Sequence, residues 1–446
     1  MQIKNICCIG AGYVGGPTMA VIALKCPQIK VTVVDANVER IKAWNGPLDH
    51  LPVYEPGLAE VIEKVRMRNL FFSNDISKAI NAAEMIFMAV NTPTKSDGEG
   101  AGMAADLKHV ESCAKDIARY SNTNKIVVEK STLPVRTAEK IKEILEKNNS
   151  EINFEILSNP EFLAEGTAIQ DLFKSDRVLI GGDETTSGKK AVEALVDIYK
   201  NWIPSEKILT TNVWSSELAK LASNAMLAQR ISSINSLSAL CEKTEADIND
   251  LSKAIGMDHR IGPHFLKSSV GFGGSCFQKD ILNLVYLCIY FGLEEVAEYW
   301  HQVVKINDYQ KDRFAQKIIT HFGGDLTEKK IIILGWAFKA KTNDSRESPA
   351  IYVAEKLFKA GATLEIYDPM VSKKRIWDDI YSYWNVKIEK KMLKSRISLL
   401  DKPRQEFGKN DIVAILTEWE EFTTYDYSKA LIFDGRNFIK TQNVKK

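Results

Sequence analysis

Short runs of β-branched and aromatic residues alternate with amphipathic stretches through the first half of the chain. This alternation is typical of parallel βαβ units, in which buried strands are joined by helices that cover the sheet. The predicted strands are residues 3–9, 31–34, 85–90, 126–129, 152–157 and 178–181. We therefore expect an α/β domain built on a parallel sheet.

The middle of the chain has a different pattern. Residues 212–241 contain no glycine or proline, and their apolar positions follow a helical period imperfectly, which predicts one long helix able to join two domains. Helical pattern continues to about residue 322. Gly323-Gly324 then interrupts the chain, and a second strand-rich part begins at Lys330.

The second strand-rich part repeats the outline of the first. Residues 3–10, a helix and residues 31–35 are matched by residues 331–335, a helix and residues 363–368. The alternative is that both parts merely contain common βαβ units. We expect an α/β fold with two Rossmann-like domains, 1–212 and 324–446, joined by a helical central domain, 213–323, while residues 370–408 give no clear pattern.

Length and composition agree with a multidomain globular protein. At about 150 residues per domain, 446 residues suggest roughly three domains. The fractions of hydrophobic residues, 45%, and of charged residues, 26%, exclude a disordered or fibrous chain. Lys+Arg 59 against Asp+Glu 58 gives a net charge of +1, which argues against a nucleic-acid surface and favours a small charged ligand.

Cysteine and histidine usage bears on compartment and metals. The seven cysteines are odd in number and scattered, so we expect reduced thiols and a cytoplasmic protein. Metal-ligand motifs of the CxxC or HExxH kind are missing, so we expect no metal. The chain opens directly into a strand rather than a secretory signal, and its most apolar stretch, 281–293, is shorter than the ~20 residues that span a bilayer. We expect no membrane association.

A glycine fingerprint follows the first predicted strand. It consists of Gly10, Ala11, Gly12, Tyr13, Val14 and Gly15. Such glycines let backbone amides at a helix N-terminus approach a pyrophosphate, and Asp35, at the end of the next strand, can accept hydrogen bonds from ribose hydroxyls. Because this carboxylate would repel a 2′-phosphate, NAD is favoured over NADP, although nearby Arg40 leaves both open.

Two later loops follow predicted strands, at the sheet edge where such folds bind ligands. One contains Val90, Asn91, Thr92, Pro93 and Thr94, and the other contains Ser131 and Thr132. We expect both to line the cofactor groove. Taken alone, each is ordinary turn chemistry.

A pair of glutamates follows the strand at 152–157. Asn159 and Pro160 suggest an N-cap and first turn of a helix, which would place Glu161 and Glu165 on one face. Two close carboxylates suit acid/base chemistry. A solvated acidic face is nearly as good an interpretation.

Lys220 and Asn224 stand four residues apart on the long predicted helix and so share a face. An ammonium beside an amide donor suits the stabilisation of an oxyanion or a proton transfer. The alternative is a surface lysine with a polar neighbour.

Residues 271–280 form a glycine-rich loop that leads into a predicted helix. We expect Cys276 in the first turn, where unpaired amides and the helix dipole favour a thiolate, and Asp280 one turn later. A buried structural cysteine is the usual alternative, and it is the one we favour for Cys7 and Cys8. For Cys276 we favour a nucleophile.

Cationic residues also follow strands of the second α/β part. Lys339 occupies the turn after residues 331–335, where it can meet a phosphate as a point charge, or be a solvated loop lysine. Arg436 ends another strand, from which a guanidinium can reach a bound anion.

These motifs, in this order, resemble the UDP-glucose/GDP-mannose dehydrogenase family over most of the chain. The matching segments are residues 10–15, 90–94, 158–166, 271–280 and 335–349. The resemblance implies an N-terminal NAD domain, a central domain that forms a dimer or an assembly of dimers, and a C-terminal UDP domain.

The resemblance also implies roles for individual residues. Catalytic residues would be Cys276, Lys220, Asn224, Asp280, Glu161 and Thr132. Cofactor contacts would include the fingerprint and the two loops above, together with Asp35, Arg40, Glu165, Cys276, Lys279 and Arg346. Substrate contacts would be Glu161, Phe162, Leu163, Ala164, Glu165, Lys220, Asn224, Arg260 from the neighbouring subunit, Lys267, Gly271, Phe272, Gly273, Phe338, Lys339 and Arg436.

The implied reaction is a four-electron oxidation of UDP-glucose to the acid, which reduces two NAD and passes through a thiohemiacetal and a thioester on Cys276. GDP-mannose or an N-acetylated UDP-sugar are alternative substrates. Outside the family, the rivals are a two-electron hydroxyacid-type dehydrogenase, which needs no thiol, and a non-catalytic dinucleotide-binding protein. Cys276, Lys220, Asn224 and Asp280 argue against both.

Overall fold

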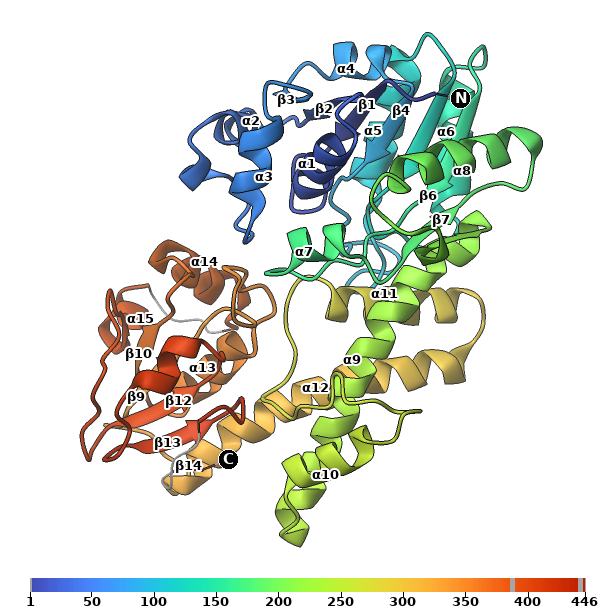
Figure 1. Ribbon diagram of the computed structural model, residues 1–446. Helices are drawn as coiled ribbons and strands as arrows, with labels where there is room; N and C mark the ends of the chain where they lie inside the picture. Colours follow the sequence, from blue (N-terminus) through green and yellow to red (C-terminus); the bar gives the residue numbers. More distant parts are fainter. Residues whose placement is uncertain (1, 386–389, 440–443, 446) are drawn as a thin grey trace. The chain divides into compact units, whose positions relative to one another are not determined.

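A computed structural model describes residues 2–385, 390–439 and 444–445 (Figure 1). The chain divides into two compact units, residues 1–223 and 224–446. The division falls inside one long helix.

The first unit contains an eight-stranded sheet in the order β3-β2-β1-β4-β5-β6-β7-β8. All neighbouring pairs are parallel except β6 and β7, which pair antiparallel at a single position. The strands are β1 (Asn5–Ile9), β2 (Lys30–Val34), β3 (Leu70–Ser73), β4 (Met85–Met88), β5 (Lys125–Glu129), β6 (Phe154–Ser158), β7 (Val178–Gly181) and β8 (Ile208–Thr211). The six predicted strands are present, and β3 and β8 are additional.

Helices cover both faces of this sheet. One face packs against α1 (Gly15–Lys25), α2 (Val38–Asn45), α3 (Leu58–Val65), α7 (Ala168–Phe173) and α8 (Thr186–Tyr199). The other packs against α4 (Ile76–Ala82), α5 (Lys108–Tyr120) and α6 (Thr137–Asn148). Cys7 and Cys8 of β1 point to opposite faces and are both fully buried, so the structural interpretation of these two cysteines is correct.

The predicted long helix is α9 (Val213–Thr244). It is followed by α10 (Ile248–Gly256), α11 (Phe277–Tyr290) and α12 (Glu294–His321), and the last two pack against each other. Short 3₁₀ turns lie at η1 (Leu48–His50), η2 (Ser205–Lys207) and η3 (Glu420–Thr424). Among the described residues, no helix combines the length and the apolar character needed to cross a membrane.

The second unit ends in a six-stranded parallel sheet in the order β11-β10-β9-β12-β13-β14. The strands are β9 (Lys330–Leu334), β10 (Thr363–Tyr367), β11 (Ile397–Leu399), β12 (Ile412–Ile415), β13 (Leu431–Asp434) and β14 (Val444–Lys445). One face packs against the end of α12 and against α13 (Pro349–Lys359), α14 (Lys373–Tyr383) and α15 (Lys390–Arg396). The stretch 370–408 therefore supplies α14, α15 and β11, apart from 386–389, which lie outside the described residues.

The two sheets repeat one topology and one hydrogen-bonding pattern. After the first strand of each sheet, the amide of Gly10 or Gly335 donates to the carbonyl oxygen of Val34 or Tyr367, at 2.8 Å in both. The next amide then donates to an acid at the end of the neighbouring strand: Ala11 to Asp35 at 2.9 Å, and Trp336 to Asp368 at 2.6 Å. The expected pair of Rossmann-like domains joined by helices is thus confirmed.

Candidate active site

The glycine turn between β1 and α1 has the shape that a dinucleotide requires. Gly10 has a φ of +111°, and a Cβ there would lie 2.3 Å from the carbonyl oxygen of Ala89. A Cβ on Gly15 would lie 2.0 Å from the carbonyl oxygen of Gly10. Only glycine fits these two positions. Without side chains there, a pyrophosphate can approach the backbone amides at the start of α1. The residues present therefore fit a bound NAD.

Asp35 lies directly after β2 and faces this turn. Its Oδ2 atom accepts hydrogen bonds from the Ala11 amide and, at 3.1 Å, from Arg40 Nη1. Arg40, the cation whose presence left NADP possible as the cofactor, therefore forms an ion pair with Asp35. A carboxylate aimed at the turn fits the ribose hydroxyls of NAD.

The loops after β4 and β5 lie side by side. Ser131 Oγ donates to the carbonyl oxygen of Val90 at 2.6 Å, and Thr92 Oγ1 donates to that of Thr132 at 3.1 Å. These two hydrogen bonds connect the two hydroxyl-rich loops directly. The sequence predicted only that both loops lie at the same edge of the sheet.

Residues 159–166 form a loop rather than the expected helix start, and α7 begins only at Ala168. Asn159 does not cap a helix, because its Nδ2 donates to the carbonyl oxygen of Leu179 at 2.8 Å. The Oε2 atom of Glu161 accepts a hydrogen bond from the Leu163 amide at 2.6 Å. The prediction that Glu161 and Glu165 share a helical face is therefore wrong.

Glu161 instead pairs with Lys220. Lys220 Nζ lies 3.5 Å from Glu161 Oε1, and both side chains are largely buried. The ring of Phe162 lies beneath two cations, 5.3 Å from Lys220 Nζ and 3.8 Å from the guanidinium carbon of Arg177. The alternative of a surface lysine is excluded, since Lys220 is only 4% exposed.

Sequence reasoning missed a second buried lysine beside this pair. Lys130 follows β5, and its Nζ donates to Asn159 Oδ1 at 3.0 Å and to the Tyr199 hydroxyl at 3.3 Å. Burial lowers the pKa of Lys130 to about 8; the charge of Glu161 opposes this shift and that of Lys220 adds to it. The available signal was a charged residue directly after an apolar strand.

In the second unit, Asn224 and Asp280 are in contact. Asn224 Nδ2 donates to Asp280 Oδ2 at 2.6 Å, both residues are buried, and Lys279 Nζ lies 3.6 Å from Asp280 Oδ1. Cys276 is the N-cap of α11, one position before the predicted first turn, and the Asp280 amide donates to its carbonyl oxygen. Cys276 is exposed, whereas the other six cysteines are buried.

The loop before Cys276 is held by a buried amide on α12. Asn307 Oδ1 accepts from the Phe272 amide at 2.8 Å, and Asn307 Nδ2 donates to the Phe272 carbonyl oxygen at 3.0 Å. A Cβ on Gly273 would lie 2.4 Å from the Glu347 carbonyl oxygen, so the loop also packs closely against residues 338–347. The sequence singled out the glycines but not Asn307.

The remaining predicted cations lie on loops of the second unit and have acidic or aromatic neighbours. Arg346 pairs with Asp344 at 2.6 Å, and Arg260 pairs with Asp258 at 2.6 Å. Lys339 Nζ lies 5.7 Å from the ring centre of Phe338, and Lys267 Nζ 5.9 Å from that of Phe438.

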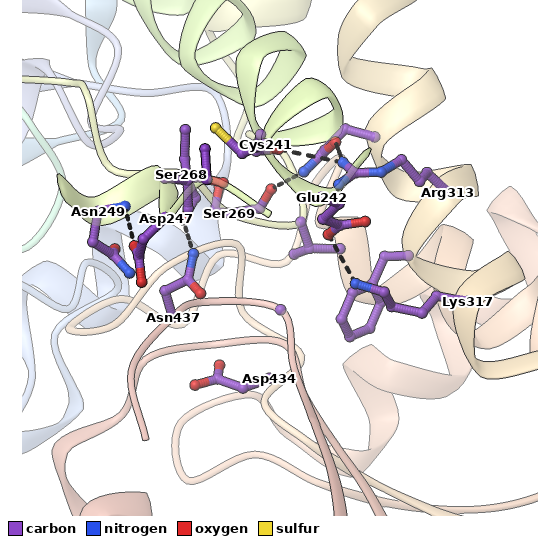
Figure 2. A pocket seen from close by; sticks show the side chains of 17 residues that line it. Cys241, Glu242, Asp247, Asn249, Ser268, Ser269, Arg313, Lys317, Asp434 and Asn437 are labelled. Atoms are coloured by element: carbon purple, nitrogen blue, oxygen red, sulfur yellow. Dashed lines mark hydrogen bonds and ion pairs between the residues drawn. The ribbon is translucent and has the colours of Figure 1, made fainter. Parts of the chain in front are cut away.

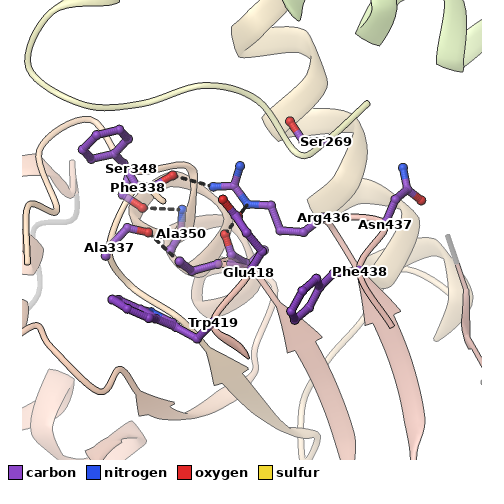
Figure 3. A network of polar contacts seen from close by, with 12 residues as sticks. Ser269, Ala337, Phe338, Ser348, Ala350, Glu418, Trp419, Arg436, Asn437 and Phe438 are labelled. Atoms are coloured by element: carbon purple, nitrogen blue, oxygen red, sulfur yellow. Dashed lines mark hydrogen bonds and ion pairs between the residues drawn. The ribbon is translucent and has the colours of Figure 1, made fainter. Parts of the chain in front are cut away.

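Arg436 joins three loops of the second unit (Figure 3). Its guanidinium donates to the carbonyl oxygens of Leu416 at 2.7 Å, Phe338 at 2.7 Å and Gly271 at 3.5 Å, and it lies 3.2 Å from a carboxylate oxygen of Glu418. The predicted anion-binding residue therefore also connects the glycine-rich loop to the C-terminal sheet.

A separate pocket of about 170 Å³ lies in the second unit, between the end of α9, the start of α10, α12 and the loop after β13 (Figure 2). Glu242 lines this pocket and pairs with Arg313 at 2.7 Å and Lys317 at 2.8 Å. None of the predicted site residues lines it.

The glycine turn with its acid, the exposed thiol and the buried lysine and amide define the class of NAD-dependent oxidoreductases with two Rossmann-like domains. Three consecutive segments match models of one family: its NAD-binding domain at residues 4–203, its central domain at 214–309 and its UDP-binding domain at 332–441. The chain belongs to the UDP-glucose/GDP-mannose dehydrogenase family.

Individual relatives agree with this assignment. The UDP-glucose 6-dehydrogenase of Mus musculus is 56% identical over 98% of this chain and 90% of its own length. UDP-glucose 6-dehydrogenase 3 of Arabidopsis thaliana is 55% identical over 99% of this chain and 95% of its own. A UDP-glucose dehydrogenase structure from Pyrobaculum islandicum has a TM-score of 0.84 and 30% identity, and covers 100% of this chain and 96% of that one.

Proposed function

We propose that this protein oxidises UDP-glucose to UDP-glucuronate, with two NAD reduced per sugar. The observation that carries the proposal is the exposed thiol of Cys276 at the start of α11, one helical turn from the buried Asn224–Asp280 pair. A two-electron alcohol dehydrogenase needs no nucleophile. The sugar itself is proposed from the names of the relatives above.

NAD would be held by the glycine turn of residues 10–15, by Asp35 and by the joined loops after β4 and β5, with further contacts from Glu165, Lys279 and Arg346. When bound, it accepts a hydride in each of the two oxidations. UDP-glucose would lie against Phe338, Lys339, Lys267, Arg436 and the loops 161–165 and 271–273, with Arg260 from a neighbouring subunit.

In the first oxidation, the C6 hydroxyl loses its proton to a base as the carbon loses its hydride. Lys220 and Asp280 are the candidates for this base, acting through water. Helix α9 is continuous and carries Lys220 and Asn224 one turn apart, which supports the proposal that both serve the same carbon.

In the second oxidation, Cys276 adds to the aldehyde carbon. The C–S bond gives a thiohemiacetal whose oxyanion can be stabilised by Lys220 and Asn224. Loss of the second hydride leaves a thioester. Water attacks this carbon, a carboxylate of Glu161 or Asp280 takes the water's proton, and the Cys276 thiolate leaves as the sugar acid forms. Thr132 would lie beside the reacting carbon.

We further propose a homodimer, or an assembly of dimers, formed through the central helices. Its support is an apolar surface at the α11–α12 turn, where six large side chains are each more than two-fifths exposed: Ile289, Tyr290, Phe291, Leu293, Val296 and Tyr299. The domain boundaries 1–212, 213–323 and 324–446 remain our proposal. So does a cytoplasmic location, which seven thiols without a disulfide support.

A substrate panel tests the choice of sugar. Purified protein with NAD is mixed separately with UDP-glucose, GDP-mannose and a UDP-N-acetylhexosamine, and NADH absorbance is followed. We expect kcat/KM to be greatest for UDP-glucose. Turnover of another nucleotide sugar alone would correct the substrate, and turnover of none would contradict the proposed activity.

A further inference from the structure

A buried carboxylate, Glu55, connects the glycine turn of the first unit to the loop before α7. It lies on the connection before α3 and is 6% exposed. Its Oε2 atom accepts hydrogen bonds from the Tyr13 hydroxyl and, at 2.8 Å, from the Gly166 amide. Its Oε1 atom accepts from the amide of Ala168, the first residue of α7, at 2.6 Å. A carboxylate is costly to bury unless its oxygens have such partners, and these partners belong to two parts of the proposed site.

Tyr13 belongs to the glycine turn that would hold the pyrophosphate of NAD. Its hydroxyl donates to Glu55 and accepts from the Gly166 amide at 3.2 Å. The Gly166 amide is therefore shared between the phenol oxygen and the carboxylate. The Tyr13 side chain also packs against the hydrophobic core of the unit, so the position of its hydroxyl follows that of the turn.

Gly166 ends the loop that would contact the sugar nucleotide. Residues 161–165 precede it directly, and its φ of +85° is one that glycine adopts readily. Inside the loop, the Ala164 amide donates to Asp171 Oδ2 of α7 at 3.0 Å. Asp171 thus fixes the loop to α7, whereas Glu55 also fixes it to the glycine turn.

We propose that Glu55 is a positioning residue that couples the cofactor turn to the sugar-nucleotide loop: it holds residues 161–166 to Tyr13, so that a ligand on either part orders the other. This inference rests on the proposed function, which supplies the two ligands. The cost of fixing the loop is then incurred once, by whichever ligand binds first. Each ligand should therefore bind more tightly when the other is present, by the same factor in both directions.

The two products measure this coupling without turnover, because NADH does not reduce a carboxylate. NADH fluorescence is titrated with protein in the absence and in the presence of saturating UDP-glucuronate. For the wild-type protein we expect UDP-glucuronate to tighten NADH binding at least about fivefold. Tyr13→Phe removes one hydroxyl and keeps the ring, so we expect this factor to fall below about twofold, while NADH affinity without UDP-glucuronate stays nearly unchanged.

Glu55→Gln breaks the same connection from the other side. A glutamine has one side-chain oxygen, so either the Ala168 amide or the Tyr13 and Gly166 donors would face an NH2 group in place of an acceptor. We expect the same loss of coupling. The double variant Tyr13→Phe/Glu55→Gln should lose no more than either single variant, because both changes act on one connection. Should Glu55→Gln not fold, Tyr13→Phe decides alone.

Asp171→Asn is the matched control, because Asp171 bonds the same loop to α7 rather than to the glycine turn. It should keep the wild-type coupling factor even where UDP-glucuronate binds less tightly. A wild-type protein without coupling, a folded Tyr13→Phe or Glu55→Gln variant that retains it, or an Asp171→Asn variant that loses it would each overturn the proposal. Failure of the proposed function would look different, because the wild-type protein would then form no NADH from NAD and UDP-glucose.

Discussion

At the scale of single residues, Glu129 and Glu217 form a buried acidic pair. Burial, and then the charge of Glu217, raise the pKa of Glu129 well above its ordinary 4.5. Burial also raises the pKa of Glu217, but the hydrogen bonds that its two oxygens accept from the amides of Ala138 at 2.8 Å and Arg136 at 2.7 Å, at the start of α6, oppose this rise. Glu129 therefore holds its proton in the folded state, whereas the unfolded chain releases it near pH 4.5.

This difference makes stability depend on pH. Above the unfolded pKa the unfolded chain binds fewer protons than the folded one, so the free energy of unfolding falls as pH rises toward the folded pKa. Glu129→Gln removes this loss, so we expect it to raise the free energy of unfolding at pH 7 and to leave it nearly unchanged near pH 4.5. Urea unfolding at both pH values measures it.

Glu217→Gln is the matched control, since it loses an acceptor for a backbone amide and should destabilise at both pH values. A gain in Glu129→Gln that does not change with pH would contradict the assigned protonation state.

A candidate functional residue could be predicted from the sequence where a recognisable motif surrounds it. Cys276 follows a run of glycines, and Asp35 closes a fingerprint. Lys130, directly after β5, and Asn307, within α12, were not singled out because one polar residue beside or within an apolar element has no period to reveal it. Their partners come from distant parts of the chain.

At the scale of elements, the glycine-rich loop before α11 depends on close backbone packing. A Cβ on Gly273 would lie 2.4 Å from the Glu347 carbonyl oxygen and 3.0 Å from Phe338 Cβ, so Gly273→Ala must displace one of the two loops. We expect KM for UDP-glucose to rise at least about tenfold, equivalent to ~1.4 kcal/mol, while NAD affinity stays unchanged. Steady-state kinetics and NAD titration measure this.

Gly408→Ala is the control for this prediction, because a Cβ there makes only an ordinary contact of 3.7 Å with Asp411. Equal KM values in Gly273→Ala and wild type would show that the loop does not shape the sugar-nucleotide site.

Helices and strands with a strong hydrophobic period could be predicted from the sequence. Segments held by contacts with residues distant in the chain could not. The strands of buried β-branched residues and helix α9 are where the pattern placed them. Residues 159–166 were predicted to start a helix because Asn-Pro is a common helix start. In the structure, the Asn159 side chain instead forms hydrogen bonds with Leu179 and Lys130. Strand β8 was missed because its residues are partly exposed and it has only four residues.

At the scale of the whole molecule, the apolar surface at the α11–α12 turn bears on assembly. A charge placed at Tyr290 and Tyr299, which are 66% and 55% exposed, would have to be buried in a dimer that uses this surface. We expect the double variant Tyr290→Glu/Tyr299→Glu to lower the molar mass in sedimentation equilibrium to that of a smaller assembly.

Met67→Lys is the matched control, because Met67 is a 72% exposed apolar side chain of the first unit, on the connection before β3. A double variant with the molar mass of wild type would exclude this surface as the subunit contact.

The duplicated architecture was predictable because both halves repeat strand, glycine turn, helix, strand and acid. The segment 370–408 was not, because α14 and α15 carry charged and aromatic residues whose places depend on contacts such as the Trp377–Tyr381 ring pair, with centres 5.6 Å apart. The local hydrophobic pattern was thus enough to predict the two sheets and the helices between their strands. The helices α14 and α15 could not be predicted in this way, because their places depend on side-chain contacts.

The central claim is a four-electron oxidation through Cys276, and the ratio of NADH formed to UDP-glucose consumed tests it most directly. NADH absorbance and chromatographic loss of the sugar nucleotide are measured in the same reaction. The account predicts a ratio of two for the wild-type protein and no normal turnover in Cys276→Ala. A ratio near one, or a Cys276→Ala variant that turns over normally, would contradict it.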